Sequence, residues 1–178
     1  MKSVQVCDKS FSLYLSEEEI IKEVKRVASA INSDLEGKCP IFLVILNGSF
    51  IFAADLLREI SIPCEIQFMR VASYEGTSST GKVKEILGLN ESIEGRTVVI
   101  VEDIIDSGTT MKELLKMLQE RNPADIRIAS LLVKPKNMKV ELDIDYRCFD
   151  IENDFIVGYG LDYNQEGRNL REIYKIIN

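Results

Sequence analysis

The sequence predicts an α/β fold with a mostly parallel central sheet flanked by helices. Three runs rich in apolar and β-branched residues, at 41–46, 97–101 and 126–133, have the composition of strands that are buried on both faces. The first two runs lead through short polar turns into apolar residues at helical spacing. Strands that alternate with helices favour a parallel sheet. No linker or repeat divides the chain, so residues 1–178 are expected to form a single domain.

The composition excludes several classes of function. The formal net charge of −7 disfavours binding to nucleic acids or to anionic membranes. No apolar run approaches the ~18–20 residues of a membrane span, and the first residues lack a signal-peptide core. Histidine is absent, so proton transfer near neutral pH would fall to a carboxylate, lysine, tyrosine or cysteine. The scattered cysteines form no Cys-x-x-Cys pair, which predicts reduced thiols in the cytoplasm and no zinc site.

The first predicted helix begins after Ser16. Glu19 completes a capping box with this serine, and the following apolar residues have helical spacing: Ile20, Ile21, Val24, Val27, Ala28 and Ile31. Gly37 and Pro40 mark the way into the next element. We expect this helix to pack against the sheet.

The strand at 41–46 ends in Asn47-Gly48-Ser49, and a helical pattern follows over 50–60. Asn-Gly is also a hairpin signal, but no alternating strand follows it. A strand-to-helix turn is therefore the better interpretation. Such a turn can offer backbone N–H groups to an anion, or it can simply reverse the chain.

Two further strands are predicted at 64–71 and 82–89. The loop between them, which begins with Ser73-Tyr74 and ends at Gly81, is small, polar and glycine-containing. It can serve as a mobile flap or as an exposed hairpin loop without a role, and composition alone favours the second interpretation.

The most informative stretch is residues 98–110, where a buried strand is followed by two carboxylates, a small-residue loop and a helix. The helix is predicted from the spacing of Met111, Leu114, Leu115 and Leu118. A loop that enters a helix offers unpaired N–H groups to a phosphate, and adjacent carboxylates suit Mg²⁺ or the two hydroxyls of a ribose. The residues that would supply these groups are Glu102, Asp103, Asp106, Ser107, Gly108, Thr109 and Thr110.

These features together describe a site for a phosphorylated sugar. The loop matches neither the P-loop nor the dinucleotide-binding turn. The alternative for each single residue is a structural role: a buried strand, solvated acids, and Ser107 or Asp106 as a helix N-cap.

Three features follow the central stretch. Lys134 ends the strand at 126–133, and Ile144, Tyr146 and Cys148 alternate as another strand. The block at 155–164 is followed by Arg168. Taken alone, Lys134 would be a solvated lysine, Phe155 a core residue, Asp162 a strand-end turn and Arg168 a surface charge.

Residues 98–110 resemble the phosphoribosyl-pyrophosphate (PRPP) signature of type I phosphoribosyltransferases. Lys134 and the 155–168 block extend the resemblance to the hypoxanthine-guanine phosphoribosyltransferase family, and it covers roughly residues 10–175. The resemblance implies a type I phosphoribosyltransferase-like fold with a flexible β-hairpin lid and a small hood contributed by the C-terminal part. Four separated motifs occur in the family's order.

The resemblance also implies a reaction. A Mg²⁺-dependent enzyme of purine salvage would transfer the 5-phosphoribosyl group of PRPP to N9 of hypoxanthine or guanine, giving IMP or GMP and pyrophosphate. It would work in the cytoplasm as a homodimer or homotetramer, with neither nucleic acid nor membrane as a partner. The alternatives are an enzyme that prefers xanthine or another base, and a regulator that keeps the fold to sense PRPP or nucleotides.

Roles for single residues follow from the resemblance as well. On the PRPP side, the 106–110 loop would bind the 5-phosphate, Glu102 and Asp103 the ribose hydroxyls or the metal, and Asn47, Gly48 and Arg168 the pyrophosphate. A cis peptide is expected just before Asn47, where the family commonly has a basic residue. Asp106 would be the catalytic residue that manages the proton on purine N7.

On the base side, Lys134 would donate to the exocyclic oxygen of a 6-oxopurine and Phe155 would stack on its ring. Ile156 and Asp162 would offer backbone groups to the purine edge. Asp162 would also help to bind a second Mg²⁺, directly or through water. Ser73 and Tyr74 would belong to the lid.

Overall fold

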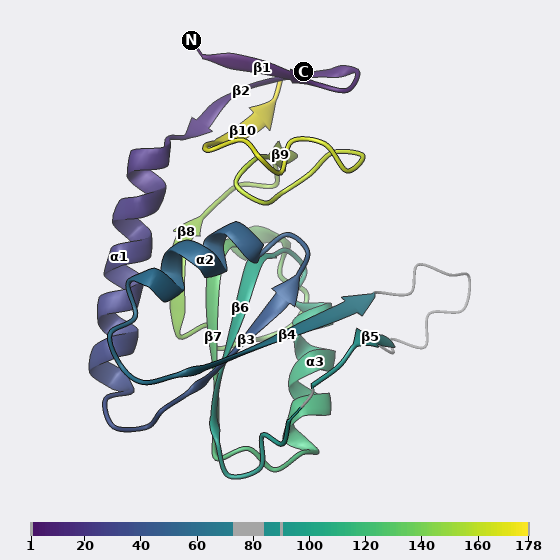
Figure 1. Ribbon diagram of the computed structural model, residues 1–178. Coiled ribbons are helices and arrows are strands. Elements are labelled where there is room, and N and C mark those ends of the chain that lie inside the picture. The colour runs from purple at the N-terminus through teal and green to yellow at the C-terminus, as the bar shows by residue number, and fades with distance from the viewer. Residues whose placement is uncertain (1, 73–83, 90, 178) are drawn as a thin grey trace.

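A computed structural model describes residues 2–72, 84–89 and 91–177 and confirms the predicted α/β architecture (Figure 1). Its central sheet has six strands in the order β5-β4-β3-β6-β7-β8. Strands β4, β3, β6, β7 and β8 are parallel, and the edge strand β5 runs antiparallel to β4. In chain order the strands are β3 (Ile41–Leu46), β4 (Glu65–Ala72), β5 (Lys84–Leu87), β6 (Thr97–Ile105), β7 (Asp125–Val133) and β8 (Tyr146–Asp150).

Helices cover both faces of this sheet. The strands alternate their side chains between the faces, so Phe42 and Val44 of β3 pack with α1 (Glu17–Asp34) and α2 (Phe50–Arg58). Leu43 and Ile45 point the other way and pack with α3 (Thr109–Gln119). This burial on both faces explains the continuous apolar runs in the sequence. Helix α1 begins with the predicted capping box of Ser16 and Glu19.

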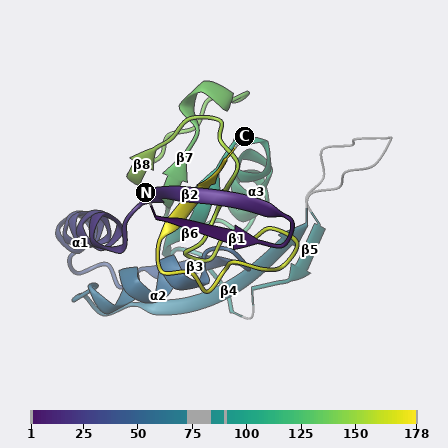
Figure 2. The ribbon, with the colours of Figure 1, turned by 90° about the horizontal axis from the view of Figure 1, so that it is seen from above.

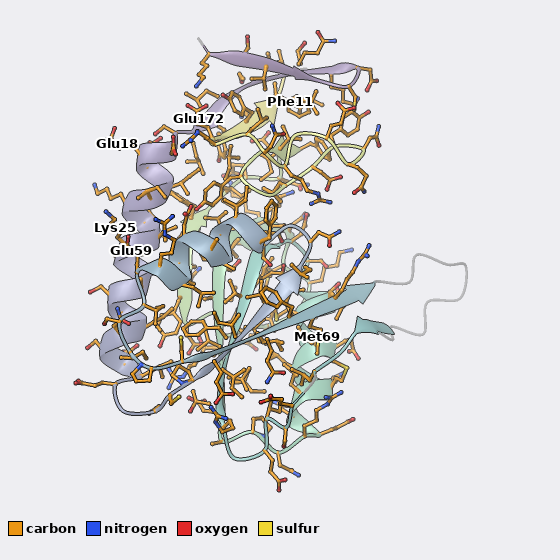
Figure 3. The ribbon with its side chains drawn as sticks, in the orientation of Figure 1. Phe11, Glu18, Lys25, Glu59, Met69 and Glu172 are labelled. Carbon is orange, nitrogen blue, oxygen red and sulfur yellow. The ribbon has the colours of Figure 1, made fainter. Side chains whose placement is uncertain are left out.

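A second, antiparallel sheet forms a hood beside the ends of the parallel strands (Figures 1 and 2). Its order is β1-β2-β10-β9, with β1 (Ser3–Val6), β2 (Lys9–Leu15), β9 (Ile156–Val157) and β10 (Ile173–Ile176). The hood is therefore not contributed by the C-terminal part alone, because its first two strands come from the start of the chain. Figure 3 shows Phe11 and Glu172 in this hood, far from Met69 in the central sheet.

The strand order places a crevice between β3 and β6. From β3 the chain passes through α2 to β4 on one side, and from β6 it passes through α3 to β7 on the other. The turns after β3 and β6 thus leave in opposite directions. In open α/β sheets, ligands bind at the carboxyl ends of the strands at such a reversal.

Strand β6 is longer than the sequence predicted. It pairs with β3 only as far as Val101, but its pairing with β7 continues to Ile105, opposite Val133. Glu102 and Asp103 therefore lie within the strand rather than after it. Backbone pairing with one neighbour is enough to carry the strand through two charged residues.

The described residues include the two strands of the predicted lid hairpin but not the loop between them. Strands β4 and β5 pair as an antiparallel hairpin, as expected. Ser73 and Tyr74 lie outside the described residues. Among the residues that the structure describes, no helix is both long and apolar enough to cross a membrane.

Candidate functional site

The 106–110 loop connects β6 to α3 and packs closely on the segment after β7. Gly108 has a φ of +77°, in the left-handed region that favours glycine. A Cβ atom at Gly108 would lie 2.9 Å from side-chain atoms of Val140 and Leu142, so these side chains would have to shift to admit one. Gly108 is also the N-cap of α3 and makes no side-chain cap hydrogen bond. Neither Ser107 nor Asp106 therefore serves as the N-cap.

Hydroxyl groups line this loop. The hydroxyls of Ser107 and Thr109 lie 2.5 Å apart, and the backbone N–H of Thr109 points to the Ser107 hydroxyl. The Lys139 backbone N–H donates to the carbonyl oxygen of Ser107. A helix start with hydroxyl donors and the positive end of the helix dipole suits a phosphate.

Two neighbouring carboxylates lie just before the loop. The backbone N–H of Asp103 donates to Glu102 Oε1 over 3.1 Å, and that of Ile104 donates to Asp103 Oδ1 over 2.7 Å. Burial and the charge of Asp103 raise the pKa of Glu102 well above its ordinary value. Burial also raises the pKa of Asp103, although the charge of Arg168 acts in the opposite direction. This pair is an acceptor-rich site for a cation or for hydroxyl donors.

The Asn47-Gly48 turn lies against these acids. The Leu46–Asn47 peptide bond is cis, as expected, and Asn47 is exposed. A Cβ atom at Gly48 would lie 1.6 Å from Asp103 Oδ2, so only glycine leaves this carboxylate its present position. The fold thus brings together a turn after β3 and a carboxylate of β6.

Arg168 reaches the same region from the hood. Its guanidinium pairs with Asp162 over 2.7 Å and donates to the Gly160 carbonyl oxygen over 2.8 Å. The Gln165 backbone N–H donates to the other oxygen of Asp162. Among the described residues, no three cysteine or carboxylate side chains converge on a point that would hold a metal ion. Asp162 is therefore engaged with Arg168 instead of joining Glu102 and Asp103.

Lys134 is not a solvated lysine. It is only 7% exposed, and its Nζ lies 3.1 Å from Asp106 Oδ2. The Lys134 backbone N–H donates to the Ile105 carbonyl oxygen. This hydrogen bond holds the backbone of Lys134 next to Asp106, where β6 and β7 end. Burial by itself would raise the pKa of Asp106, but hydrogen bonds from Asn137 and Lys134 and the charges of Lys134 and Lys139 lower it below the usual 3.8.

Two asparagines that the sequence did not single out complete this contact. Asn137 Nδ2 donates to Asp106 Oδ1 and, over 3.2 Å, to Asn153 Oδ1. Lys134 Nζ also donates to Asn153 Oδ1, over 3.4 Å. The only sequence signal was one asparagine in each of two loops that flank the recognised motifs.

Phe155 follows Asn153 by two residues and presents an accessible aromatic ring. The residue is 45% exposed, and its ring meets the Tyr163 ring edge-on, with centroids 5.6 Å apart, while the Phe11 ring lies within 6.4 Å of both. The Tyr163 hydroxyl donates to Asp8 in the first hairpin. Ile156 is buried in β9. Phe155 is thus an accessible ring held by the hood rather than a core residue.

Comparison with known proteins gives consistent matches. A family model described as a phosphoribosyl transferase domain matches residues 11–164. A hypoxanthine-guanine phosphoribosyltransferase of Streptococcus agalactiae is 45% identical over 156 residues, which are 87% of each chain. One of Streptococcus pneumoniae is 45% identical over 157 residues, covering 88% of this chain and 87% of the relative.

Solved structures agree in fold. A hypoxanthine phosphoribosyltransferase from Staphylococcus aureus superposes with a TM-score of 0.89 at 39% identity, over 93% of this chain and 91% of that one. A hypoxanthine-guanine phosphoribosyltransferase from Bacillus anthracis, with a HEPES molecule in its active site, gives 0.88 at 38% identity, over 94% and 97% of the two chains.

Proposed function

Because this chain belongs to the phosphoribosyl transferase domain family, we propose that it is a hypoxanthine-guanine phosphoribosyltransferase of purine salvage. It transfers the 5-phosphoribosyl group of PRPP to N9 of hypoxanthine or guanine. The products are IMP or GMP and pyrophosphate.

One observation carries the choice of base: the donor Lys134 Nζ lies 3.1 Å from the acceptor Asp106 Oδ2. In its neutral N7–H tautomer, a 6-oxopurine presents the complementary pair on one edge of the ring: O6 accepts a hydrogen bond, and N7–H donates one. Lys134 would donate to O6, and Asp106 would accept the N7 proton as N9 forms its bond. Phe155 would stack on the ring, and backbone groups of Ile156 and Asp162 would meet its opposite edge.

The PRPP side is built from the two turns at the crevice. The hydroxyls and N–H groups of the 106–110 loop support its assignment to the 5-phosphate, and Glu102 and Asp103 would bind the ribose hydroxyls. Arg168 and the Asn47-Gly48 turn flank Asp103, which supports a pyrophosphate position there. Asn47 carries no charge, so among these groups Arg168 supplies the cation.

The carboxylates also fit Mg²⁺, which is usually held by one or two carboxylates together with waters and substrate phosphates. Glu102 and Asp103 repel each other and would gain a counter-charge, and Asp162 would contribute through a water because Arg168 occupies its Oδ1. When bound, Mg²⁺ supplies positive charge that stabilises the departing pyrophosphate.

Catalysis by this chain rests on positioning and electrostatics. As pyrophosphate leaves, positive charge develops on the ribose, and the carboxylates of Glu102 and Asp103 lie where they would stabilise it. The assigned role of Ser73 and Tyr74 in the lid is exclusion of water, which would otherwise capture the ribosyl cation.

The proposal extends to the working form of the protein. We place residues 1–178 in a single domain and the enzyme in the cytoplasm, in keeping with four cysteines that are all free thiols. A homodimer or homotetramer is supported by Ile66 and Phe68, which expose 47% and 48% of their surface side by side on β4. Light scattering after gel filtration tests the oligomeric state.

A panel of bases tests the function. Purified protein is supplied with Mg²⁺, PRPP and hypoxanthine, guanine, xanthine or adenine, and nucleotide and pyrophosphate are measured. Hypoxanthine and guanine should be converted. Adenine should be worse by about 10⁴–10⁵-fold, because its 6-amino group would present a donor to the buried ammonium of Lys134 where a 6-oxopurine presents an acceptor.

The panel also separates the alternatives. Faster conversion of xanthine would establish a different base preference. Binding of PRPP with no transfer to any base would instead indicate a sensor of PRPP.

A further inference from the structure

The two asparagines beside Asp106 form a closed ring of hydrogen bonds with the proposed reactive pair. Lys134 Nζ donates to Asp106 Oδ2 and to Asn153 Oδ1, and Asn137 Nδ2 donates to Asp106 Oδ1 and to Asn153 Oδ1. Donors and acceptors alternate around the ring. Each of its four members comes from the loops that follow β6, β7 and β8.

The chemistry of the ring fixes the orientation of both amides. An ionised Asp106 has only acceptors, so Asn137 must turn its NH₂ group toward it. Asn153 faces that NH₂ group and the ammonium of Lys134, which are both donors, so it must present its oxygen. The two asparagines, only 3.2 Å apart, therefore have opposite roles.

We propose that Asn137 is a positioning residue for base transfer: it holds Asp106 by Oδ1 so that Oδ2 faces the purine next to Lys134. Asn153 is the matching acceptor for Lys134. When the purine takes the place of the direct contact between Lys134 and Asp106, the contacts with the asparagines keep both side chains in register. This inference rests on the proposed function.

The ring also fixes the ionisation of Asp106. Asn137 and Lys134 donate to the two oxygens of the carboxylate, and the charges of Lys134 and Lys139 also lower its pKa. Without Asn137, Asp106 would keep its two lysine neighbours, but its side chain would be free to rotate. The rate of transfer to the base should then fall more than the affinity for PRPP.

The same isosteric change at the two asparagines should cause losses of very different size. Asn137→Asp puts a second carboxylate against Asp106 in place of a donor, so kcat/KM for hypoxanthine at pH 8 should fall by about 10²-fold. Asn153→Asp keeps the acceptor that Lys134 and Asn137 use, so the loss should be at most about fivefold. Asn137→Ala, which only removes the donor, should lose about 10- to 100-fold.

The pH dependence separates positioning from a structural role. Two neighbouring carboxylates share a proton as the pH falls, and a protonated group at position 137 again donates to Asp106. The loss of kcat/KM in N137D relative to wild type should therefore become smaller as the pH falls from 8 to 5. The ratio of kcat/KM in N153D to that in wild type should not change over this range. Asn122→Asp adds the same charge at the exposed turn before β7, at the opposite end of the sheet, and serves as the matched control.

The outcomes are distinct. The midpoint of thermal denaturation and the KM for PRPP should change little in all variants, which would exclude misfolding. Equal losses in N137D and N153D, or an N137D defect that does not depend on pH, would overturn the inference while leaving the function intact. A wild-type protein with no transfer to hypoxanthine would overturn the proposed function itself.

Discussion

Gly160 packs its backbone directly against that of Gly48: a Cβ atom at Gly160 would lie 2.0 Å from the Gly48 carbonyl oxygen. Gly48 in turn leaves room for the carboxylate of Asp103. A residue of the hood segment, a turn of the central sheet and a carboxylate of β6 are thus stacked without an intervening side chain. The hood segment and the central sheet therefore meet backbone to backbone at this point.

Gly160→Ala should therefore destabilise the fold and raise the KM for PRPP, because a methyl group would push the Asn47-Gly48 turn away from its place. Gly37→Ala is the matched control: Gly37 also has a positive φ, of 76°, but nothing lies within 4 Å of the added atom. The control should cost only the conformational penalty of about 1–2 kcal/mol. Urea denaturation and PRPP kinetics measure both, and equal losses in the two variants would show that the close approach is unimportant.

Asp106→Asn should reduce turnover by about 10²–10⁴-fold, because the amide cannot accept the N7 proton. PRPP affinity should change little, since the hydroxyls and N–H groups of the 106–110 loop remain. Steady-state kinetics with hypoxanthine give the turnover, and calorimetry with PRPP and Mg²⁺ gives the affinity. Unchanged turnover would remove Asp106 from the proton-transfer role.

Gln67 offers a test of stability away from the site. Its side chain is buried on β4, and among the described residues neither its amide nitrogen nor its amide oxygen has a hydrogen-bond partner. Gln67→Leu removes this unsatisfied group and should stabilise the protein by about 1–3 kcal/mol. The same change at the exposed Gln119 should have almost no effect. Destabilisation by Gln67→Leu, measured by thermal unfolding, would contradict this account.

Cys148 should make the protein sensitive to alkali. Burial raises the pKa of this thiol from 9.0 to about 12. Below pH 9 both folded and unfolded chains hold the proton, whereas between pH 9 and 12 only the unfolded chain releases it. The free energy of unfolding should therefore fall with rising pH, by about 1.4 kcal/mol per unit for this one group.

Cys148→Ala should remove the contribution of Cys148 to the pH dependence of the free energy of unfolding, even if the lost packing also lowers stability at every pH. Burial also raises the pKa of Tyr146 and Tyr159, so part of the alkaline decline should remain in the variant. Denaturant titrations at several pH values between 8 and 11 give the slope. An identical slope in C148A and wild type would exclude Cys148 as a source of the pH dependence.

Much of the site was predictable because it follows local patterns. The turns after β3 and β6 adjoin apolar runs whose length and β-branched composition favour buried strands, and Lys134 ends a third such run. The length of β6 was underestimated because its last residues are held by pairing with β7, which a local pattern of charges does not reveal. Asn137 and Asn153 were missed for a similar reason: single asparagines in loops are common, and only the fold brings these two together.

Local sequence patterns also could not reveal which strands form the hood. Strand β2 finds its partner in β10, where Ser12 lies opposite Lys175. Short alternating segments so far apart do not indicate which strand they will join. The resemblance pointed to the C-terminal part and left out the first hairpin.

This pairing imposes an order on biosynthesis. As the ribosome extends the chain, β2 emerges at the start, but its partner β10 appears only after every strand of the central sheet. A nascent chain that has reached β8 already contains Glu102, Asp103 and the 106–110 loop, but β2 still lacks its partner strand. Strand β9, which carries Ile156 of the proposed base pocket, also pairs with β10, so this part of the pocket reaches its final place only after residues 173–176 have been synthesised.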